Sequence, residues 1–251
     1  MKQNTSFKII LVAASCAVLF TAFSSYAFYN ANKNDPNLIE KVQKVLSERY
    51  ALKNLTISIN GQGGYGALRK TSDVWNFPAQ TKEIEINAVS ADIEMAYTDG
   101  DEIIVKANGE LAENSKSVRL LKTEFSENQL LIEEADDGSS KNVKINVYIP
   151  KSFSKNVVVE SVSGNVSITK LKFENLKANT VSGEINISED SSLTLELNSV
   201  SGNIKLNVKN PNLLKVTTET VSGKILINHK TSNQGTIPVE LHTVSGDITL
   251  D

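Results

Sequence analysis

The stretch TVSGEINIS, residues 180–188, is one of five close copies of the same phrase, and these copies decide the fold. The other copies begin SVSGNVSI at 161–168, SVSGNIKL at 199–206, TVSGKILI at 220–227 and TVSGDITL at 243–250. The glycines of consecutive copies are 19, 19, 21 and 23 residues apart. A period near twenty residues is typical of repeat proteins, in which each copy is a structural unit that stacks on its neighbours. AVSADI at 88–93 matches as a sixth, degenerate copy with Ala91 in place of the glycine.

Each copy predicts a strand, a bend and a second strand. In the third copy, Leu195 and Leu197 share one parity, whereas Val200, Gly202 and Ile204 share the opposite one. The inward side therefore switches by one residue at 198–199, which is typical of a corner or a bulge. We expect the valine and the glycine of each corner to face inward, and the serine between them to face outward or lie along the bend.

Stacking these units predicts an all-β fold, a β-solenoid-like stack of repeats of about 20 residues. A large β-sandwich is the alternative, because the same spacing fits a pair of hairpin strands. The corner needs glycine either because a Cβ would crowd the neighbouring coil or because the backbone requires a φ that only glycine tolerates. The residues predicted to form the repeat corners are Val162, Ser163, Gly164, Val181, Ser182, Gly183, Val200, Ser201, Gly202, Val221, Ser222, Gly223, Val244, Ser245 and Gly246.

Three segments are expected along the chain. Residues 1–27 combine early lysines, an uncharged apolar run and small residues ending at Ala27, which is typical of a signal peptide. Two alternatives stay open: an uncleaved membrane anchor, since residues 7–28 are long enough to span a bilayer, and lipidation at Cys16, although Ala13 stands where that signal prefers leucine. Residues 28–74 are expected to form a linker with a short helix at about 36–50 and one strand at 55–59. Residues 75–251 are expected to form the β-strand repeat domain.

Composition excludes several classes of protein. The chain has 251 residues, 40% of them hydrophobic, which suffices for a core, and its formal charge is −3. No basic field of the kind that nucleic-acid binding requires is present, so nucleic acid is not an expected partner. Cys16 is the only cysteine, so the exported part is expected to contain neither a disulfide nor reactive thiol chemistry.

No catalytic or cofactor-binding constellation is visible, and we expect neither an enzyme nor a cofactor nor a metal site. His229 and His242 lie in different repeats and belong to no metal-ligand motif. A serine that recurs five times is not expected to be a nucleophile. The position after each glycine is interpreted as a solvated column, although outward carboxylates converging on one face would favour a polysaccharide-acting enzyme; it holds Asn165, Glu184, Asn203, Lys224 and Asp247. The acidic turn around Glu133 and Glu134 is likewise interpreted as a solvated loop rather than a calcium site.

The segment from about 75 to 251 resembles the bacterial putative-adhesin family of unknown-function domains, described as β-strand repeat-containing proteins. The resemblance rests on AVSADIEM and DGDEIIVKA early, NVYIPKSF in the middle, and the VVVESVSGNVSI and TVSGEINI copies that follow. It implies an extracytoplasmic, all-β, solenoid-like domain without assigned catalytic residues. The segments at 36–50 and 55–59 lie outside it.

These observations predict an exported, non-catalytic β-repeat module with a structural or adhesin-like binding role at the cell envelope or surface. The expected partner is a surface or envelope protein or a glycan, and the expected contact with a membrane is through the N-terminal segment alone. A membrane-tethered envelope sensor or assembly factor is one alternative, and a polysaccharide-acting enzyme is another. We expect the C-terminal strand to be an uncapped edge. This edge would be covered by the helix at 36–50 or the strand at 55–59, or would pair with a partner or a second copy.

Overall fold

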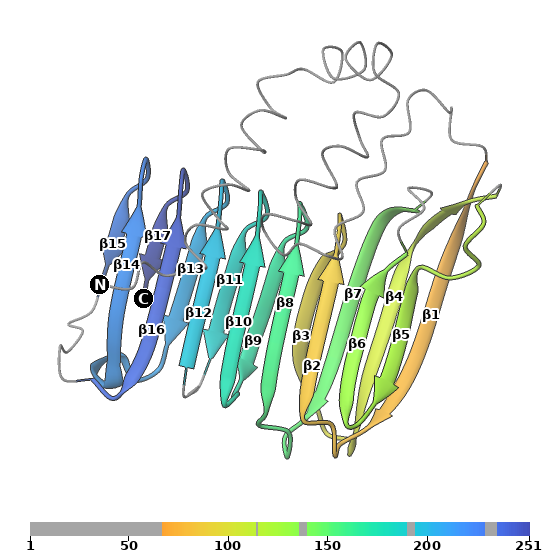
Figure 1. The fold of residues 1–251 in the computed structure, drawn as a ribbon, viewed down its shortest axis with the longest axis horizontal. Helices are drawn as coiled ribbons and strands as arrows, with labels where there is room; N and C mark the ends of the chain where they lie inside the picture. The colour runs from red at the N-terminus through yellow and green to blue at the C-terminus, as the bar shows by residue number, and fades with distance from the viewer. Residues whose placement is uncertain (1–66, 114, 136–139, 190–193, 229–234) are drawn as a thin grey trace, which may run out of the picture.

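The computed structural model describes residues 67–113, 115–135, 140–189, 194–228 and 235–251, and these form two large mixed β-sheets (Figure 1). The all-β prediction is confirmed for this part of the chain, which contains no α-helix and one turn of 3-10 helix at Pro211–Leu213. The predicted signal or anchor segment, the helix at 36–50 and the strand at 55–59 lie outside the described residues.

The two sheets face each other across one hydrophobic core. The nine-stranded sheet has the order β1(Leu68–Pro78), β4(Glu102–Ala112), β7(Ser140–Pro150), β3(Asp92–Thr98), β9(Val166–Leu171), β11(Ile185–Glu189), β13(Ile204–Val208), β17(Ile248–Leu250) and β15(Ile225–Ile227). The eight-stranded sheet has the order β14(Leu214–Thr220), β16(Ile237–Thr243), β12(Thr194–Ser199), β10(Asn175–Thr180), β8(Asn156–Ser161), β2(Glu83–Ala88), β6(Gln129–Glu134) and β5(Leu121–Ser126).

The repeats form coils, where a coil is one strand of the eight-stranded sheet, a corner, and the next strand in the nine-stranded sheet. The five copies give the β8–β9, β10–β11, β12–β13, β14–β15 and β16–β17 coils, and the degenerate copy gives the β2–β3 coil. Neighbouring coils pair through parallel strands in both sheets. Hairpin strands of a sandwich would be antiparallel, and among the described strands antiparallel pairing joins only β1 to β4, β4 to β7 and β5 to β6.

The core is built by stacking like side chains from coil to coil. Ile185 pairs in register with Val166 on one side and with Ile204 on the other, and all three are buried. The opposite sheet stacks Ala178 between Val159 and Leu197. Strands of β-branched and aliphatic residues alternate inward and outward with period two, so every coil except the outermost β14–β15 coil buries the same positions. Full burial of one such aliphatic side chain contributes roughly 1.5–3 kcal/mol relative to exposure.

The coils do not stack in the order in which the chain makes them. β17 lies between β13 and β15, and β16 lies between β12 and β14, so the last coil occupies the place next to the third copy and the fourth copy is outermost. The expectation that the C-terminal strand forms the free edge is therefore wrong: β17 is paired on both sides, and among the described strands β14 and β15 are the edge strands at this end of the stack. The spacings before and after the fourth copy are longer, at 21 and 23 residues. They provide the extra residues with which the chain skips the place beside the third copy and then returns to fill it with the β16–β17 coil.

The opposite end of the stack is closed by aromatic side chains. Phe77 of β1 and Phe125 of β5 bring their ring centroids to 6.0 Å, so the two sheets meet there. The guanidinium of Arg119 lies 5.7 Å from the centre of the Trp75 ring. The carboxylate of Asp73 accepts a hydrogen bond of 3.0 Å from the N–H of Leu120. The two ends of the stack therefore differ, one covered and one open.

Candidate interaction surface

The corner glycines are required by close approach between coils. A Cβ on Gly183 would lie 2.0 Å from the carbonyl oxygen of Gly164, and one on Gly202 would lie 1.9 Å from that of Gly183. Gly164 meets the carbonyl of Ala91 in the same way, at 1.8 Å. None of these glycines has a φ in the left-handed region. Of the two reasons considered for glycine, crowding by the neighbouring coil is the one that operates at these corners.

A hydroxyl precedes each corner, and at four of the five corners it is buried and accepts the N–H of the glycine, whereas the half-buried Thr220 donates to the carbonyl of Gly246. The N–H of Gly202 donates to Oγ of Ser199 at 2.8 Å, and that of Gly183 donates to Oγ1 of Thr180 at 3.0 Å. Ser161 and Thr243 do the same at their corners. The strand that leads into each corner, such as β12, therefore keeps this hydroxyl residue on its inward face. The change of inward parity falls between the hydroxyl residue and the glycine, which in the third copy is later than the predicted 198–199. The signal in the sequence was the invariant Ser or Thr before each Val-Ser-Gly.

The corner valines lie at the rim of the core. Val200 is buried, whereas Val162, Val181 and Val244 are half-buried and Val221 is exposed. Their backbone N–H groups donate to the neighbouring coil, as from Val181 to the carbonyl of Ser161 at 3.2 Å. These valines contribute backbone pairing and partial burial, which is less than the fully inward position expected of them.

The corner serines point outward and bind backbone. The hydroxyls of Ser163, Ser182 and Ser201 donate to the carbonyl of the valine in the preceding coil at 3.1, 3.3 and 3.2 Å. Ser222 and Ser245 are exposed at the equivalent positions. In the first three copies, these hydroxyls are engaged in fastening coil to coil.

The position after each glycine forms a ladder of hydrogen-bond acceptors. The N–H of Asn165 donates to Asp92, that of Glu184 to Asn165 and that of Asp247 to Asn203, each at 2.9 Å. The ladder ends at the N–H of Lys224, which donates to Asp247 at 2.8 Å. Lysine has no side-chain acceptor, so at this position the outermost coil has no side chain that could accept a hydrogen bond from a further coil. This column was interpreted as solvated, and its side chains also bind neighbouring backbone.

Glu134 caps the degenerate corner. Its Oε2 accepts hydrogen bonds from the N–H groups of Val89, Ser90 and Ala91 at 2.7, 2.7 and 3.0 Å, and its Oε1 accepts the Ser90 hydroxyl at 3.0 Å. The carboxylate is buried, so it replaces the contacts that a further coil would make. The interpretation of Glu134 as part of a solvated turn is wrong, and the alternation in QLLIEE was the signal, because Glu134 shares the inward parity of Leu130 and Ile132.

The outer face of the eight-stranded sheet carries a continuous polar row, which we call the amide–carboxylate row. Strand register places one residue from each of five neighbouring strands in line. Asn198 donates to Asn179 at 2.9 Å, and Asn179 donates to Glu160 at 3.4 Å. The members of the row, from β8 to β14, are Glu160, Asn179, Asn198, His242 and Glu219.

The surroundings of the row are predominantly acidic. Carboxylates on this outer face come from Glu83, Glu85, Glu133, Glu160, Glu196, Glu219 and Glu240, against ammonium groups from Lys122, Lys177 and Lys215. Lys177 pairs with Glu196 at 3.0 Å, and His242 lies between Glu219 at 3.5 Å and Glu240 at 3.8 Å. The face is suited to cations and to hydroxyl-rich ligands, which bind to carboxylate and amide oxygens.

Two exposed ion pairs mark the outer face and the edge of the nine-stranded sheet. Glu94 lies 2.6 Å from Nζ of Lys144, and this hydrogen bond raises the pKa of Lys144 above its ordinary value. Asp99 accepts a hydrogen bond of 2.9 Å from Lys151, which lowers the pKa of Asp99 and raises that of Lys151. Such pairs on exposed side chains contribute little to stability.

Among the described residues, no group of three or more His, Cys, Asp or Glu side chains could hold a metal ion. His242 lies in the row, whereas His229 is outside the described residues. In the same part of the chain, no helix is both long and apolar enough to cross a bilayer.

A family model described as Toastrack DUF4097 matches residues 51–251. The chain belongs to the Toastrack DUF4097 family. The predicted membership of an adhesin-like family of unknown function is confirmed, and the Toastrack match also takes in the segment at 55–59, which the sequence resemblance left outside. No curated protein matches the chain.

Solved structures similar to this chain have low sequence identity to it. A structure from Clostridium sporogenes, described as a putative cell adhesion protein, is 12% identical with a TM-score of 0.58, over 72% of this chain and 99% of its own. A putative adhesin from Bacteroides fragilis is 16% identical with a TM-score of 0.38, over 73% of this chain and 97% of its own. A putative lipid binding protein from Parabacteroides distasonis is 14% identical with a TM-score of 0.29, over 72% and 96%. At these identities the likeness concerns the fold alone.

Proposed function

We propose that this protein is an exported, solenoid-like, non-catalytic module that binds a partner at the cell envelope or surface in an adhesin-like manner. The observation that carries the proposal is the amide–carboxylate row, a line of polar side chains across five strands in which Asn198 is buried and the members on either side of it are partly or fully exposed. A row of this kind suits an extended, hydroxyl-rich glycan, because each coil repeats the same polar position at a spacing of about 4.8 Å. The predicted signal or anchor segment at 1–27 and the name of the Clostridium sporogenes structure, a putative cell adhesion protein, support the proposal.

The same face bears on the enzyme alternative, because outward carboxylates do gather there. Their partners favour binding over catalysis. Glu160 accepts from Asn179, Glu196 from Asn198, and Glu85 from Asn87. A glycosidase needs one carboxyl group free to donate a proton and a second beside the scissile bond. Carboxylates that accept hydrogen bonds from neighbouring asparagines along a flat sheet are better placed to bind a ligand than to cleave it.

Export is tested by fusing alkaline phosphatase after Asp251, since this enzyme becomes active only outside the cytoplasm. The fusion of the full chain is expected to be active, and the same fusion lacking residues 1–27 is expected to be inactive. Equal activity of the two fusions, or none in either, would contradict export by this segment.

Binding is tested with the purified protein on envelope glycans and whole cells of the producing species. Asn179→Ala removes one member of the row and should weaken retention about tenfold, the loss of one to two hydrogen bonds in a contact. The matched control is Asn186→Ala, because Asn186 belongs to the same coil, is also half-buried and faces outward from the other sheet. Equal retention by wild type and both variants would exclude the row as the binding face.

A further inference from the structure

The outermost coil presents two free strand edges and an apolar surface. Among the described strands, β14 pairs only with β16, and β15 pairs only with β17. The relative exposures are 68% for Val221, 42% for Ile225, 54% for Leu226 and 38% for Ile227. The edge of β15, which is apolar and contains no charged residue, is a template for pairing with another strand. Three of these residues make up β15, whose inward positions are buried in every other described coil.

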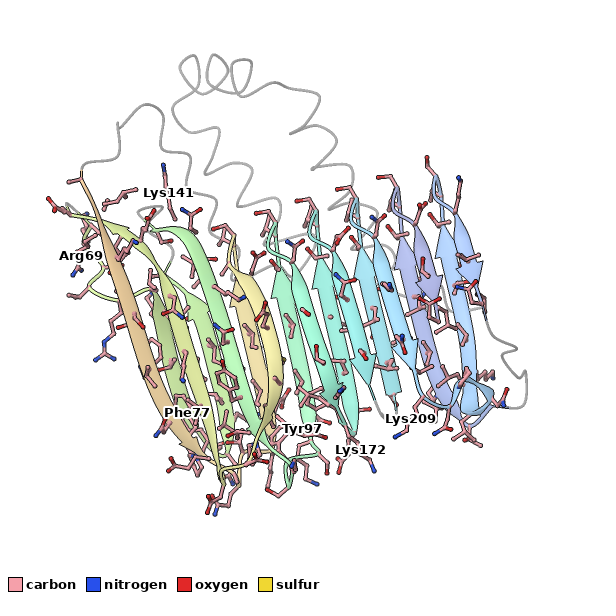
Figure 2. All side chains as sticks on the ribbon, turned by 180° about the vertical axis from the view of Figure 1, so that it is seen from behind. Arg69, Phe77, Tyr97, Lys141, Lys172 and Lys209 are labelled. Atoms are coloured by element: carbon pink, nitrogen blue, oxygen red, sulfur yellow. The ribbon has the colours of Figure 1, made fainter. Side chains whose placement is uncertain are left out.

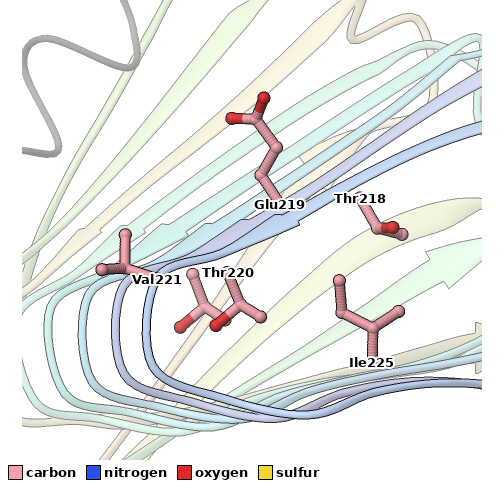
Figure 3. A pocket seen from close by; sticks show the side chains of 6 residues that line it. Thr218, Glu219, Thr220, Val221 and Ile225 are labelled. Carbon is pink, nitrogen blue, oxygen red and sulfur yellow. The ribbon is translucent and has the colours of Figure 1, made fainter.

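The space between these two edges is hollow. A depression of about 460 Å³ is lined by Thr218, Thr220 and Ile225 together with Glu219, Val221 and Thr243. Figure 3 shows the side chains of Thr218 and Ile225 on facing sides of the depression, and Glu219 directed away from it. The end of the core is therefore open here, whereas the other end is closed by Phe77 and Phe125.

We propose that this open end binds the open end of a second copy of the chain. The two copies would be related by a two-fold axis that crosses both sheets and passes between β14 and its copy and between β15 and its copy. Antiparallel pairing of β14 with β14 of the second copy, centred on Thr217, places Lys215 opposite Glu219 of the second copy and Glu219 opposite its Lys215. Opposite charges directly across an antiparallel pair stabilise it. The strand sequence LKVTTET is thus complementary to itself.

The other edge fits the same axis. The sequence of β15, Ile225-Leu226-Ile227, reads the same in both directions, so its antiparallel self-pairing puts isoleucine opposite isoleucine. Thr217 lies five residues before Ser222 of the corner and Leu226 lies four residues after it. Thr217 and Leu226 are therefore at similar distances from the corner along their strands, so one axis passes close to both residues. A single two-fold operation then pairs β14 and β15 with their copies and covers the depression of each copy. An interface of this type is isologous and closes on itself as a dimer.

The strand predicted at 55–59 is a poorer occupant of the β15 edge, because its connection to β1 is too short to span the sheet. Eight strand spacings separate β1 from β15 in the nine-stranded sheet, which is about 38 Å at 4.8 Å per strand. The nine residues from Ile59 to Leu68, fully extended, span at most about 32 Å. The expectation that this strand covers the edge is therefore not favoured for β15. The predicted helix at 36–50 is connected through a longer segment and is the rival that the experiment must exclude.

Cysteine cross-linking of the full-length protein tests the axis. Thr217 and Glu219 are both exposed on the outer face of β14. Thr217→Cys places two cysteines directly opposite each other, at about 5 Å between Cβ atoms, which is close to the geometry of a disulfide. Glu219→Cys is the matched control, because the two copies of residue 219 would lie about 14 Å apart, four residues along antiparallel strands. We expect Thr217→Cys to form a disulfide dimer under mild oxidation, identified by mass spectrometry as a 217–217 peptide, and Glu219→Cys to form none.

Charge reversal supplies a second readout in the purified protein. Lys215→Glu and Glu219→Lys should each weaken the dimer at least about tenfold, because each creates two like-charge pairs. The double variant should restore it, since both pairs then carry opposite charges. Within one chain the two side chains are four strand residues apart and do not meet, so rescue reports contact between copies. Glu124→Lys, an equivalent exposed change on the edge strand β5 at the closed end, should leave the dimer unchanged.

Three outcomes would overturn the proposal. The first is a mass by sedimentation that stays monomeric up to about 100 μM, a concentration at which a specific interface would be populated. The second is cross-linking at residue 219 in preference to 217. The third is protection of amides 214–227 from hydrogen exchange that is independent of protein concentration, which would assign the covering to the N-terminal segment. This inference does not depend on the glycan proposal, because a dimer can form whether or not the row binds a ligand.

Discussion

The Cβ that Gly183 lacks would lie 2.0 Å from the carbonyl oxygen of Gly164 in the neighbouring coil. The same relationship joins Gly202 to Gly183 and Gly246 to Gly202. Each glycine therefore sets the distance between two coils, and a methyl group at any one of them must push two paired strands apart.

Gly183→Ala is expected to destabilise the protein by about 3 kcal/mol, because overpacking against backbone cannot be relieved by a rotamer change. Gly100→Ala is the control, since Gly100 lies in an exposed turn and its nearest neighbour to an added Cβ is Thr98 Oγ1 at 3.6 Å. The free energy of unfolding in urea measures both. Similar midpoints for the two variants would contradict the close-approach explanation.

Thr180→Val keeps the shape of the side chain and removes the hydroxyl that accepts the N–H of Gly183 at 3.0 Å. A buried donor without a partner costs about 1–3 kcal/mol, so the free energy of unfolding should fall by that amount. Thr180→Ser keeps the hydroxyl, as Ser161 and Ser199 do at equivalent corners, and should cost less. A serine variant less stable than the valine variant would rule out this role for the hydroxyl.

Glu134→Gln replaces one carboxylate oxygen with an NH₂ group that faces backbone donors. Glu134 accepts from three consecutive N–H groups and the Ser90 hydroxyl, so we expect a loss of about 2 kcal/mol in unfolding free energy. Glu133→Gln, on the adjacent and more exposed residue, should change stability by less than about 0.5 kcal/mol. Hydrogen exchange of amides 89–91 gives a local measurement, and unchanged protection in Glu134→Gln would disagree with the cap.

Ile248→Ala and Ile225→Ala test the order of the coils. The two residues are register partners in β17 and β15, but Ile248 is fully buried and Ile225 is 42% exposed. Truncation should cost about 2–5 kcal/mol at Ile248. At Ile225 the expected cost is less than half of that in the monomer. If the two costs were reversed, β17 rather than β15 would be at the free edge.

Lys151→Ala tests the electrostatics of an exposed pair. The hydrogen bond from Lys151 holds the pKa of Asp99 below its ordinary value, so its removal should raise that pKa, measured by NMR titration of the carboxyl carbon. Because the folded pKa is lowered, the pair's contribution is present above the unfolded pKa of Asp99 and disappears as the pH falls through the folded pKa. Lys155→Ala, whose partner is Glu174, should leave the Asp99 titration unchanged.

Much of the stack could be predicted from the sequence because each coil repeats its own local chemistry. The Val-Ser-Gly phrase marks the corner, the alternation of isoleucine and leucine marks the inward face, and even the copy with Ala91 forms a coil in register with its neighbour. Figure 2 shows the result, with side chains repeating from coil to coil along the molecule.

The order of the coils could not be predicted, because near-identical repeats pair equally well with several neighbours. Nothing in Ile248 or Ile225 specifies which one lies next to Ile204. The longer spacing around the fourth copy was the one indication in the sequence that the coils stack in a different order from the chain. For Glu134, the alternation in QLLIEE indicated an inward side chain, but its hydrogen-bond partners could not be predicted because they lie more than 40 residues away in the sequence. The amide–carboxylate row likewise depends on register between strands that the repeat spacing alone does not fix.

The position of the last coil between two earlier ones also constrains how the molecule can be made. Synthesis delivers residues 214–227 before residues 237–250, yet the first set joins the stack only through the second. The chain therefore cannot complete its fold from the N-terminus onward, one coil at a time. Until residues 237–251 have been synthesised, β12 and β13 each lack a native partner, and the β14–β15 coil has only non-native edges with which to pair.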